Sequence, residues 1–143
     1  MADVVDRLIS ALNAHDVDAV MRCYRPDAVA TWPDMEAGNP QEIGSYCTQM
    51  WEAFPNLRFT RWEKTACGDA IATEMVACGT QTGPYLLVGG EVLEATGRSV
   101  SARCSCFWNV VDDLIASQRF YYDQLQVYTQ LGMCLPPVFR LSR

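Results

Sequence analysis

The sequence predicts a single α+β domain in which helices cover one face of a curved antiparallel sheet. Helical spacing of apolar residues marks the first third of the chain, and strand-like runs separated by turns fill most of the remainder. With 143 residues, half of them hydrophobic, the chain is long enough for one core of its own, so we assign residues 1–143 to one domain. Helices that precede the strands in the sequence predict a layer of helices packed on one face of the sheet. Such a curved sheet can leave an apolar pocket between itself and the helices.

Three helices are expected before the main run of strands. Apolar residues recur at helical spacing over residues 3–13, and Asp16 is suited to cap a second, short helix that extends to Tyr24. The clearest amphipathic helix covers residues 41–54, where apolar side chains fall at i, i+3, i+4, i+7, i+8 and i+11. Pro55 follows it and ends the helical pattern.

The strands begin with a short segment before a loop at residues 33–40, and four longer runs follow. Residues 83–97 hold four glycines and a proline, which predicts a long hairpin loop, and residues 123–131 predict a last helical turn or two. The expected strands are Ala28–Trp32, Leu57–Ala66, Ile71–Thr82, Ser99–Val110 and Leu114–Tyr122.

Charge and composition exclude several classes of protein. The formal net charge is −6, which argues against binding to nucleic acid or to an anionic membrane surface. The first ten residues do not resemble a targeting peptide, and no apolar run reaches the roughly 18 residues of a membrane helix. We therefore expect a cytoplasmic protein.

The residues that usually hold cofactors are missing or poorly spaced. The seven cysteines are irregularly placed and far from the single histidine, His15, so we expect reduced thiols and no metal site. The chain also lacks the glycine-rich nucleotide loops and the nucleophile-elbow motif. We expect no cofactor.

Six short segments, none specific alone, occur in a recognisable order and spacing. They are Leu12–Asp18, Ala53–Leu57, Gly79–Gly83, Thr96–Arg98, Tyr121–Gln124 and Gln130–Gly132. In this order they resemble the SnoaL-like polyketide cyclase family of the nuclear transport factor 2-like superfamily. The resemblance implies a cone-shaped sheet wrapped around the N-terminal helices, a deep pocket, and homodimers that pack through the sheet.

The same resemblance implies cofactor-free acid/base chemistry on a small hydrophobic substrate, a polyketide or a polycyclic terpenoid. Cyclases of the family close rings by intramolecular aldol reactions, and relatives act as hydroxylases, isomerases or epoxide hydrolases. By motif position the catalytic acid/base residue is Asp123. Strand alternation places Arg119 and Tyr121 on the same face as Asp123, where they would stabilise an enolate. The alternative is that Asp123 only caps the last helix.

Bulky side chains and a few polar ones are the candidate substrate contacts. We expect Trp32, Tyr46, Met50 and Trp51 to wall the pocket, because a flat ligand needs aromatic and methionine surfaces. The candidate site also includes Gln81, at a position where many relatives have histidine. Arg103, on the strand before the one that carries Arg119, completes it. His15, the single histidine, is also a candidate general base, but its place in a turn between helices favours a capping role.

Two classes of function remain open from the sequence. The first is an enzyme, a SnoaL-like cyclase or isomerase of secondary metabolism such as antibiotic biosynthesis. The second is a ligand-binding or dimerisation module without catalysis. Apolar residues on both faces of the expected strands also predict a homodimer that buries the outer sheet face.

Overall fold

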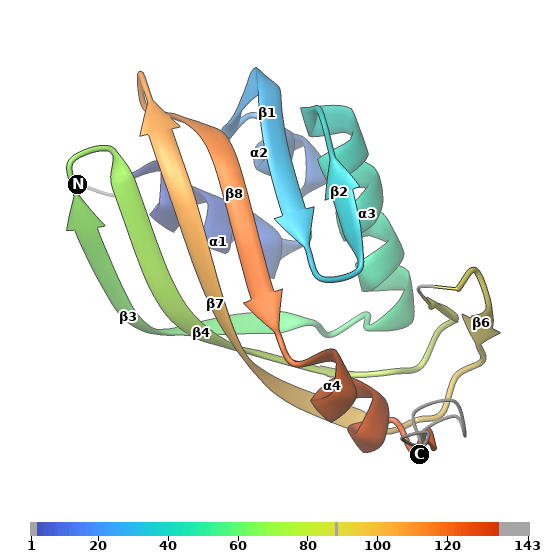
Figure 1. Ribbon diagram of the computed structural model, residues 1–143. Coiled ribbons are helices and arrows are strands. Elements are labelled where there is room, and N and C mark those ends of the chain that lie inside the picture. Colours follow the sequence, from blue (N-terminus) through green and yellow to red (C-terminus); the bar gives the residue numbers. More distant parts are fainter. Residues whose placement is uncertain (1–2, 88, 135–143) are drawn as a thin grey trace, which may run out of the picture.

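The computed structural model describes residues 3–87 and 89–134, and its main feature is a strongly curved sheet that wraps around helices on its concave side (Figure 1). Six strands form this sheet in the order β2-β1-β8-β7-β4-β3, and β5 and β6 form a separate small hairpin. The elements are α1 (Val4–Ala14), α2 (Val17–Met21), β1 (Tyr24–Trp32), β2 (Met35–Ala37), α3 (Pro40–Ala53), β3 (Arg58–Cys67), β4 (Ala70–Thr80), β5 (Tyr85–Leu86), β6 (Val92–Leu93), β7 (Ser99–Val111), β8 (Leu114–Tyr122) and α4 (Gln124–Gln130). The predicted α+β class is confirmed.

The N-terminal helices begin and end where local chemistry requires. Asp3 and Asp6 form a capping box at the start of α1, and His15 ends that helix in a left-handed conformation with φ of 55°. Asp16 caps α2 as predicted, since its side chain accepts a hydrogen bond from the Ala19 backbone. The tight turn between the helices folds α2 back toward α3.

The sheet differs from the expected one in two respects. Strand β1 runs parallel to β8, whereas the other neighbouring strands of this sheet are antiparallel, so the sheet is mixed. The expected loop at residues 33–40 contains β2, which pairs with the end of β1. The β7–β8 turn has positive φ at both Asp112 and Asp113, the backbone of a tight hairpin turn.

Side-chain alternation on β7 shows how the sheet builds the core. Its even-numbered residues from Val100 to Trp108 are buried on the concave face, and most of the residues between them are exposed. All seven cysteines are free, and four of them, Cys23, Cys47, Cys104 and Cys106, are buried. They therefore act as small apolar side chains in this core.

The segment after β4 is fixed against the C-terminal end of α3. The backbone nitrogen of Gly83 donates to the carbonyl oxygen of Ala53 at 3.2 Å. A β-carbon at position 83 would collide with the backbone carbonyl of Glu52, so only glycine allows this approach. Gln81 holds the same segment, because its amide nitrogen donates to three backbone carbonyls of the loop.

We expect Gly83→Ala to destabilise the protein by about 1–3 kcal/mol, because the clash is with backbone and cannot be relieved by a side-chain rotation. Gly38→Ala is the matched control, since a β-carbon there meets no atom within 4 Å, and it should change stability by less than about 0.5 kcal/mol. Urea unfolding of both variants makes the comparison. Equal stability of the two variants would show that α3 does not depend on this contact.

Candidate functional site

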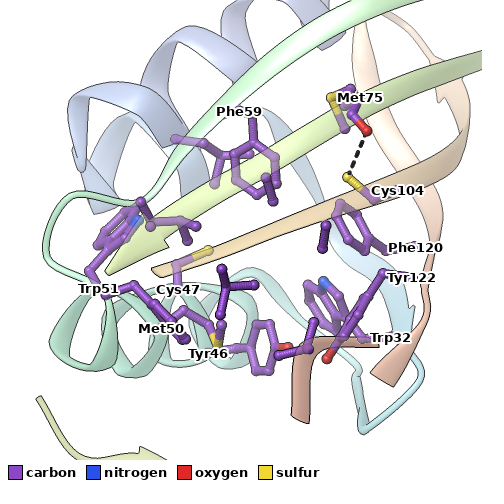
Figure 2. Close-up of a pocket in the computed structure, with 18 of the residues that line it drawn as sticks. Trp32, Tyr46, Cys47, Met50, Trp51, Phe59, Met75, Cys104, Phe120 and Tyr122 are labelled. Atoms are coloured by element: carbon purple, nitrogen blue, oxygen red, sulfur yellow. Dashed lines mark hydrogen bonds between the residues drawn. The ribbon is translucent and has the colours of Figure 1, made fainter. Parts of the chain in front are cut away.

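An apolar pocket lies between α3 and the concave face of the sheet (Figure 2). Helix α3 supplies one wall, and β3, β4, β7 and β8 supply the other. The lining residues are Leu8, Leu12, Tyr24, Trp32, Tyr46, Cys47, Met50, Trp51, Phe54, Leu57, Phe59, Met75, Ala77, Gly79, Tyr85, Val100, Ala102, Cys104, Trp108, Gln118, Phe120, Tyr122 and Val127. Trp32, Tyr46, Met50 and Trp51 line this pocket, and their contact with a substrate stays a prediction.

The pocket has the size of a single ring. Its volume is about 110 Å³. An engineered apolar cavity of about 150 Å³ holds benzene, and pockets for drug-sized ligands usually measure about 300–1,000 Å³. A ring-sized part of a ligand therefore fits the pocket as it stands, and a larger polycycle requires side chains at its mouth to move.

The inward face of β8 is the opposite of the one that the sequence predicts. Asn109 and Val110 of β7 pair with Ser117 and Ile115, which leaves Ala116 as an extra residue, a β-bulge. A bulge shifts the alternation by one residue. Ile115 is fully buried before it, and the even-numbered residues of β8 line the pocket after it.

The predicted placement of Arg119, Tyr121 and Asp123 inside the pocket is therefore wrong. The Arg119 guanidinium lies 5.8 Å from the centre of the Phe107 ring, and that ring contacts Tyr121, which is 51% exposed. Both side chains belong to the outer face of the sheet. Their catalytic role stays a prediction.

Two further candidates also lie outside the pocket. Arg103 projects from the outer face of β7 over the ring of Trp62, at 5.3 Å from its centre. Gln81 is fully buried, and both ends of its amide bind the loop that follows β4. The structure gives Gln81 a part in holding this loop, and neither residue lines the pocket.

Asp123 occupies the N-cap of α4. Its Oδ1 atom accepts a hydrogen bond from the backbone nitrogen of Gln126 at 3.1 Å, and the side chain is exposed. This is the capping role that the sequence left as the alternative. It accounts for an aspartate directly after the last strand without any reaction.

Asp34 is a carboxylate beside the pocket that the sequence reasoning missed. It lies in the β1–β2 turn, half-buried, and the Tyr46 hydroxyl donates to its two oxygens at 3.1 and 3.3 Å. Burial raises the pKa of Asp34 above its usual range, against the lowering effect of the Tyr46 hydrogen bond. The only signal in the sequence is an acidic residue that follows the buried end of a strand.

Several tyrosines surround this carboxylate. Burial raises the pKa of Tyr122 to about 12, and the Asp34 charge adds to the effect. The pKa values of Tyr46 and Tyr85 are raised for the same two reasons. Figure 2 shows Tyr46 and Tyr122 near Trp32 at one end of the pocket. Their hydroxyls therefore stay protonated near neutral pH and serve as hydrogen-bond donors.

Gln118 supplies a polar group deeper in the same pocket. Its Oε1 atom accepts hydrogen bonds from the Tyr24 hydroxyl at 2.5 Å and from Trp108 Nε1 at 2.8 Å. The side chain is only 5% exposed. An amide is thus held rigidly within an otherwise apolar lining.

His15 lies outside the pocket lining. Its Nε2 atom is 2.8 Å from the carbonyl oxygen of Leu57, and its ring stacks on Trp51 with 4.7 Å between ring centres. These contacts join the end of α1 to α3 and to the start of β3. They favour the structural role that the sequence indicates for this histidine.

Among residues 3–87 and 89–134, no group of three or more histidine, cysteine or acidic side chains is arranged to hold a metal ion. Over the same residues, no helix has the length and apolar character needed to cross a membrane.

Comparison with known proteins identifies the family. The SnoaL-like domain model matches residues 5–118, and the chain belongs to this family. No curated protein sequence matches the chain.

Solved structures support the same fold. A protein of Jannaschia sp. CCS1 assigned as a SnoaL-like polyketide cyclase has a TM-score of 0.80 at 22% identity, over 94% of this chain and 91% of the other. AclR of Streptomyces galilaeus, assigned as a hydroxylase, gives 0.78 at 20% identity over 94% and 83%. An epoxide hydrolase of M. tuberculosis gives 0.68 at 17% identity over 90% and 86%. One fold thus carries several reactions.

We expect Asp34→Asn to raise the melting temperature at pH 7 but not near pH 3. The raised pKa of Asp34 means that the folded state loses stability as the pH rises from the ordinary aspartate value to the raised one, and the loss persists above it. Asparagine carries no charge and so has no such penalty.

Asp123→Asn is the control, because the same substitution at an exposed N-cap relieves no burial and asparagine caps equally well. Thermal unfolding of both variants across this pH range makes the comparison. A pH-independent effect of Asp34→Asn would contradict the description of Asp34 as a half-buried carboxylate with a raised pKa.

Proposed function

We propose that the protein is an acid/base enzyme that forms an enolate on an apolar, ketone-bearing substrate of the polyketide type and closes a ring by intramolecular aldol addition. The observation that carries this proposal is the Asp34–Tyr46 pair, a carboxylate of raised pKa next to an apolar pocket. Membership in the SnoaL-like family supports it. Terpenoid ketones have the same chemistry and belong to the same class.

Asp34 is the base in this proposal. Its carboxylate removes a proton from the carbon next to a ketone, and the C–H electron pair moves to the carbonyl oxygen. The Tyr122 hydroxyl donates to that oxygen as charge develops on it. The enolate carbon then bonds to a second carbonyl carbon, and the resulting alkoxide takes the proton back from Asp34. A base with a raised pKa is well matched to this transfer near neutral pH.

The other reactions of the fold receive less support from this pocket. Epoxide hydrolysis in this superfamily uses two acids with an arginine between them, whereas Asp34 is held by the Tyr46 hydroxyl and no arginine is among the residues that line the pocket. An isomerase shares the enolate step and differs only in where the proton returns. Isomerisation is therefore the alternative that the same residues would serve.

Proton exchange tests the proposal without knowledge of the natural substrate. We choose 4-acetylphenylacetone, a single ring with a ketone at each end, and follow the loss of its methylene proton signal in D₂O. The wild-type protein should accelerate this exchange, and Asp34→Asn should reduce the acceleration by about 10²-fold or more, as for loss of a general base. Exchange is read by NMR.

Asp123→Asn separates this proposal from the one that the sequence favours. Both variants replace aspartate with asparagine, and the Asp123 cap is preserved. We expect Asp123→Asn to keep the exchange activity. Loss of exchange in Asp123→Asn with retention in Asp34→Asn would make Asp123 the base, and absence of exchange with the wild-type protein would favour a binding module.

We also propose that the protein forms a homodimer through the outer sheet face. Trp62, Phe107 and Tyr121 are 53%, 40% and 51% exposed there, an unusual number of aromatic side chains for a surface in water. A dimer that covers them would bury an interface of about 1,600 Å² in total.

Light scattering at micromolar concentration should therefore give twice the chain mass of 16.0 kDa. We expect the double variant Trp62→Glu, Phe107→Glu to be monomeric, because charge at the centre of such an interface is strongly unfavourable. Leu125→Glu, on α4 and 49% exposed, is the control and should stay dimeric. A wild-type monomer would contradict the proposal.

A further inference from the structure

The amide group of Gln118 has one end bound by the protein and the other end without a partner. Gln118 lies in the middle of β8, opposite Trp108 on β7 and Ala30 on β1, and its side chain lines the pocket. Its oxygen accepts the two hydrogen bonds from Tyr24 and Trp108. No residue within 3–87 or 89–134 accepts a hydrogen bond from its nitrogen.

The orientation of this amide follows from chemistry. An indole N–H can only donate, so the Gln118 atom that faces Trp108 must be the oxygen. Burial raises the pKa of the Tyr24 hydroxyl, which therefore stays protonated and donates to the same oxygen. A flip of the amide would place its NH₂ group against the indole N–H of Trp108, which cannot accept a hydrogen bond. The nitrogen is consequently held as a donor.

Gln81 provides an internal comparison. Both glutamines are more than nine-tenths buried, and both oxygens accept two hydrogen bonds. The Gln81 nitrogen donates to three backbone carbonyls, whereas the Gln118 nitrogen donates to no described residue. The Gln118 side chain lines the pocket, so a ligand acceptor there would give its nitrogen the hydrogen bond that the described residues do not supply.

We propose that the Gln118 amide nitrogen binds a carbonyl oxygen at the inner end of the ligand, and that this contact selects neutral ketones. The lining residues include no lysine, arginine or histidine, so a ligand carboxylate would be buried there without a counter-charge. A ketone needs only one donor. A hydrocarbon of the same shape would leave the amide unsatisfied.

This contact positions the ligand and takes no part in proton transfer. Gln118 and Tyr122 are four residues apart on one strand, a separation of roughly 13 Å. Asp34 lies beside the tyrosines at the other end of the pocket. The inference rests on the proposed use of this pocket as a ligand site, and it assigns Gln118 a carbonyl distant from the reacting one.

Acetophenone and cumene test the contact, because they have similar shapes and differ in the carbonyl oxygen. The wild-type protein should bind acetophenone more tightly, and the carbonyl stretch of the bound ketone should lie at a lower frequency than in a hydrocarbon solvent. In Gln118→Met we expect acetophenone affinity to fall about tenfold while cumene affinity does not fall. Calorimetry and infrared spectroscopy give the two readouts.

Gln130→Met is the matched control, because Gln130 binds the Ser101 backbone outside the pocket, and it should change neither affinity. If Gln118→Met does not fold, the carbonyl frequency is measured in the double variant Tyr46→Phe, Tyr122→Phe, which lacks the tyrosine hydroxyls at the other end of the pocket. A shift that persists in this variant supports Gln118, and a shift that is lost overturns the assignment. An unshifted frequency, equal loss of both probes, or no binding of acetophenone to the wild type would overturn the assignment. A shifted carbonyl frequency together with full exchange activity in Asp34→Asn would support the Gln118 contact and contradict only the proposal that Asp34 is the base.

Discussion

The β-bulge at Ala116 determines which side chains of β8 face the pocket. It changes the alternation between Ile115 and Ser117, so that Gln118, Phe120 and Tyr122 lie on the concave side. Without this one extra residue, the odd-numbered residues would continue inward and bring a guanidinium into the core. Bulges commonly redirect side chains near functional sites, and here the bulge separates an apolar, tyrosine-rich interior from an aromatic and cationic exterior.

The pocket that this bulge helps to form has a polar group near each of its two ends. Gln118 is fixed by Tyr24 and Trp108 deep in the pocket, and Asp34 is held by Tyr46 at the other end. Apolar and aromatic side chains make up most of the pocket lining (Figure 2). A neutral ligand with oxygens at both ends fits this arrangement better than a charged one, which agrees with polyketide-like substrates and with the absence of charged residues from the lining.

Much of the fold is predictable from the sequence because helix caps and apolar periodicity are local signals. Asp16, the 41–54 helix and the four long strands lie close to their predicted positions. The walls contributed by Trp32 and α3 follow from the same periodicity. The polar part of the site cannot be predicted in this way. One bulge reverses the alternation of side chains on β8. Asp34 is held by Tyr46, and this contact between a turn and a helix leaves no local pattern in the sequence.

The central claim is that the concave face of β8 is the functional one. A structure of the protein with bound 4-acetylphenylacetone tests it most directly. We expect the acetyl oxygen within hydrogen-bonding distance of Gln118 Nε2, the ring against Phe120, and the acetonyl group next to Asp34. A ligand bound instead on the convex face, against Arg119 and Tyr121, would contradict the account.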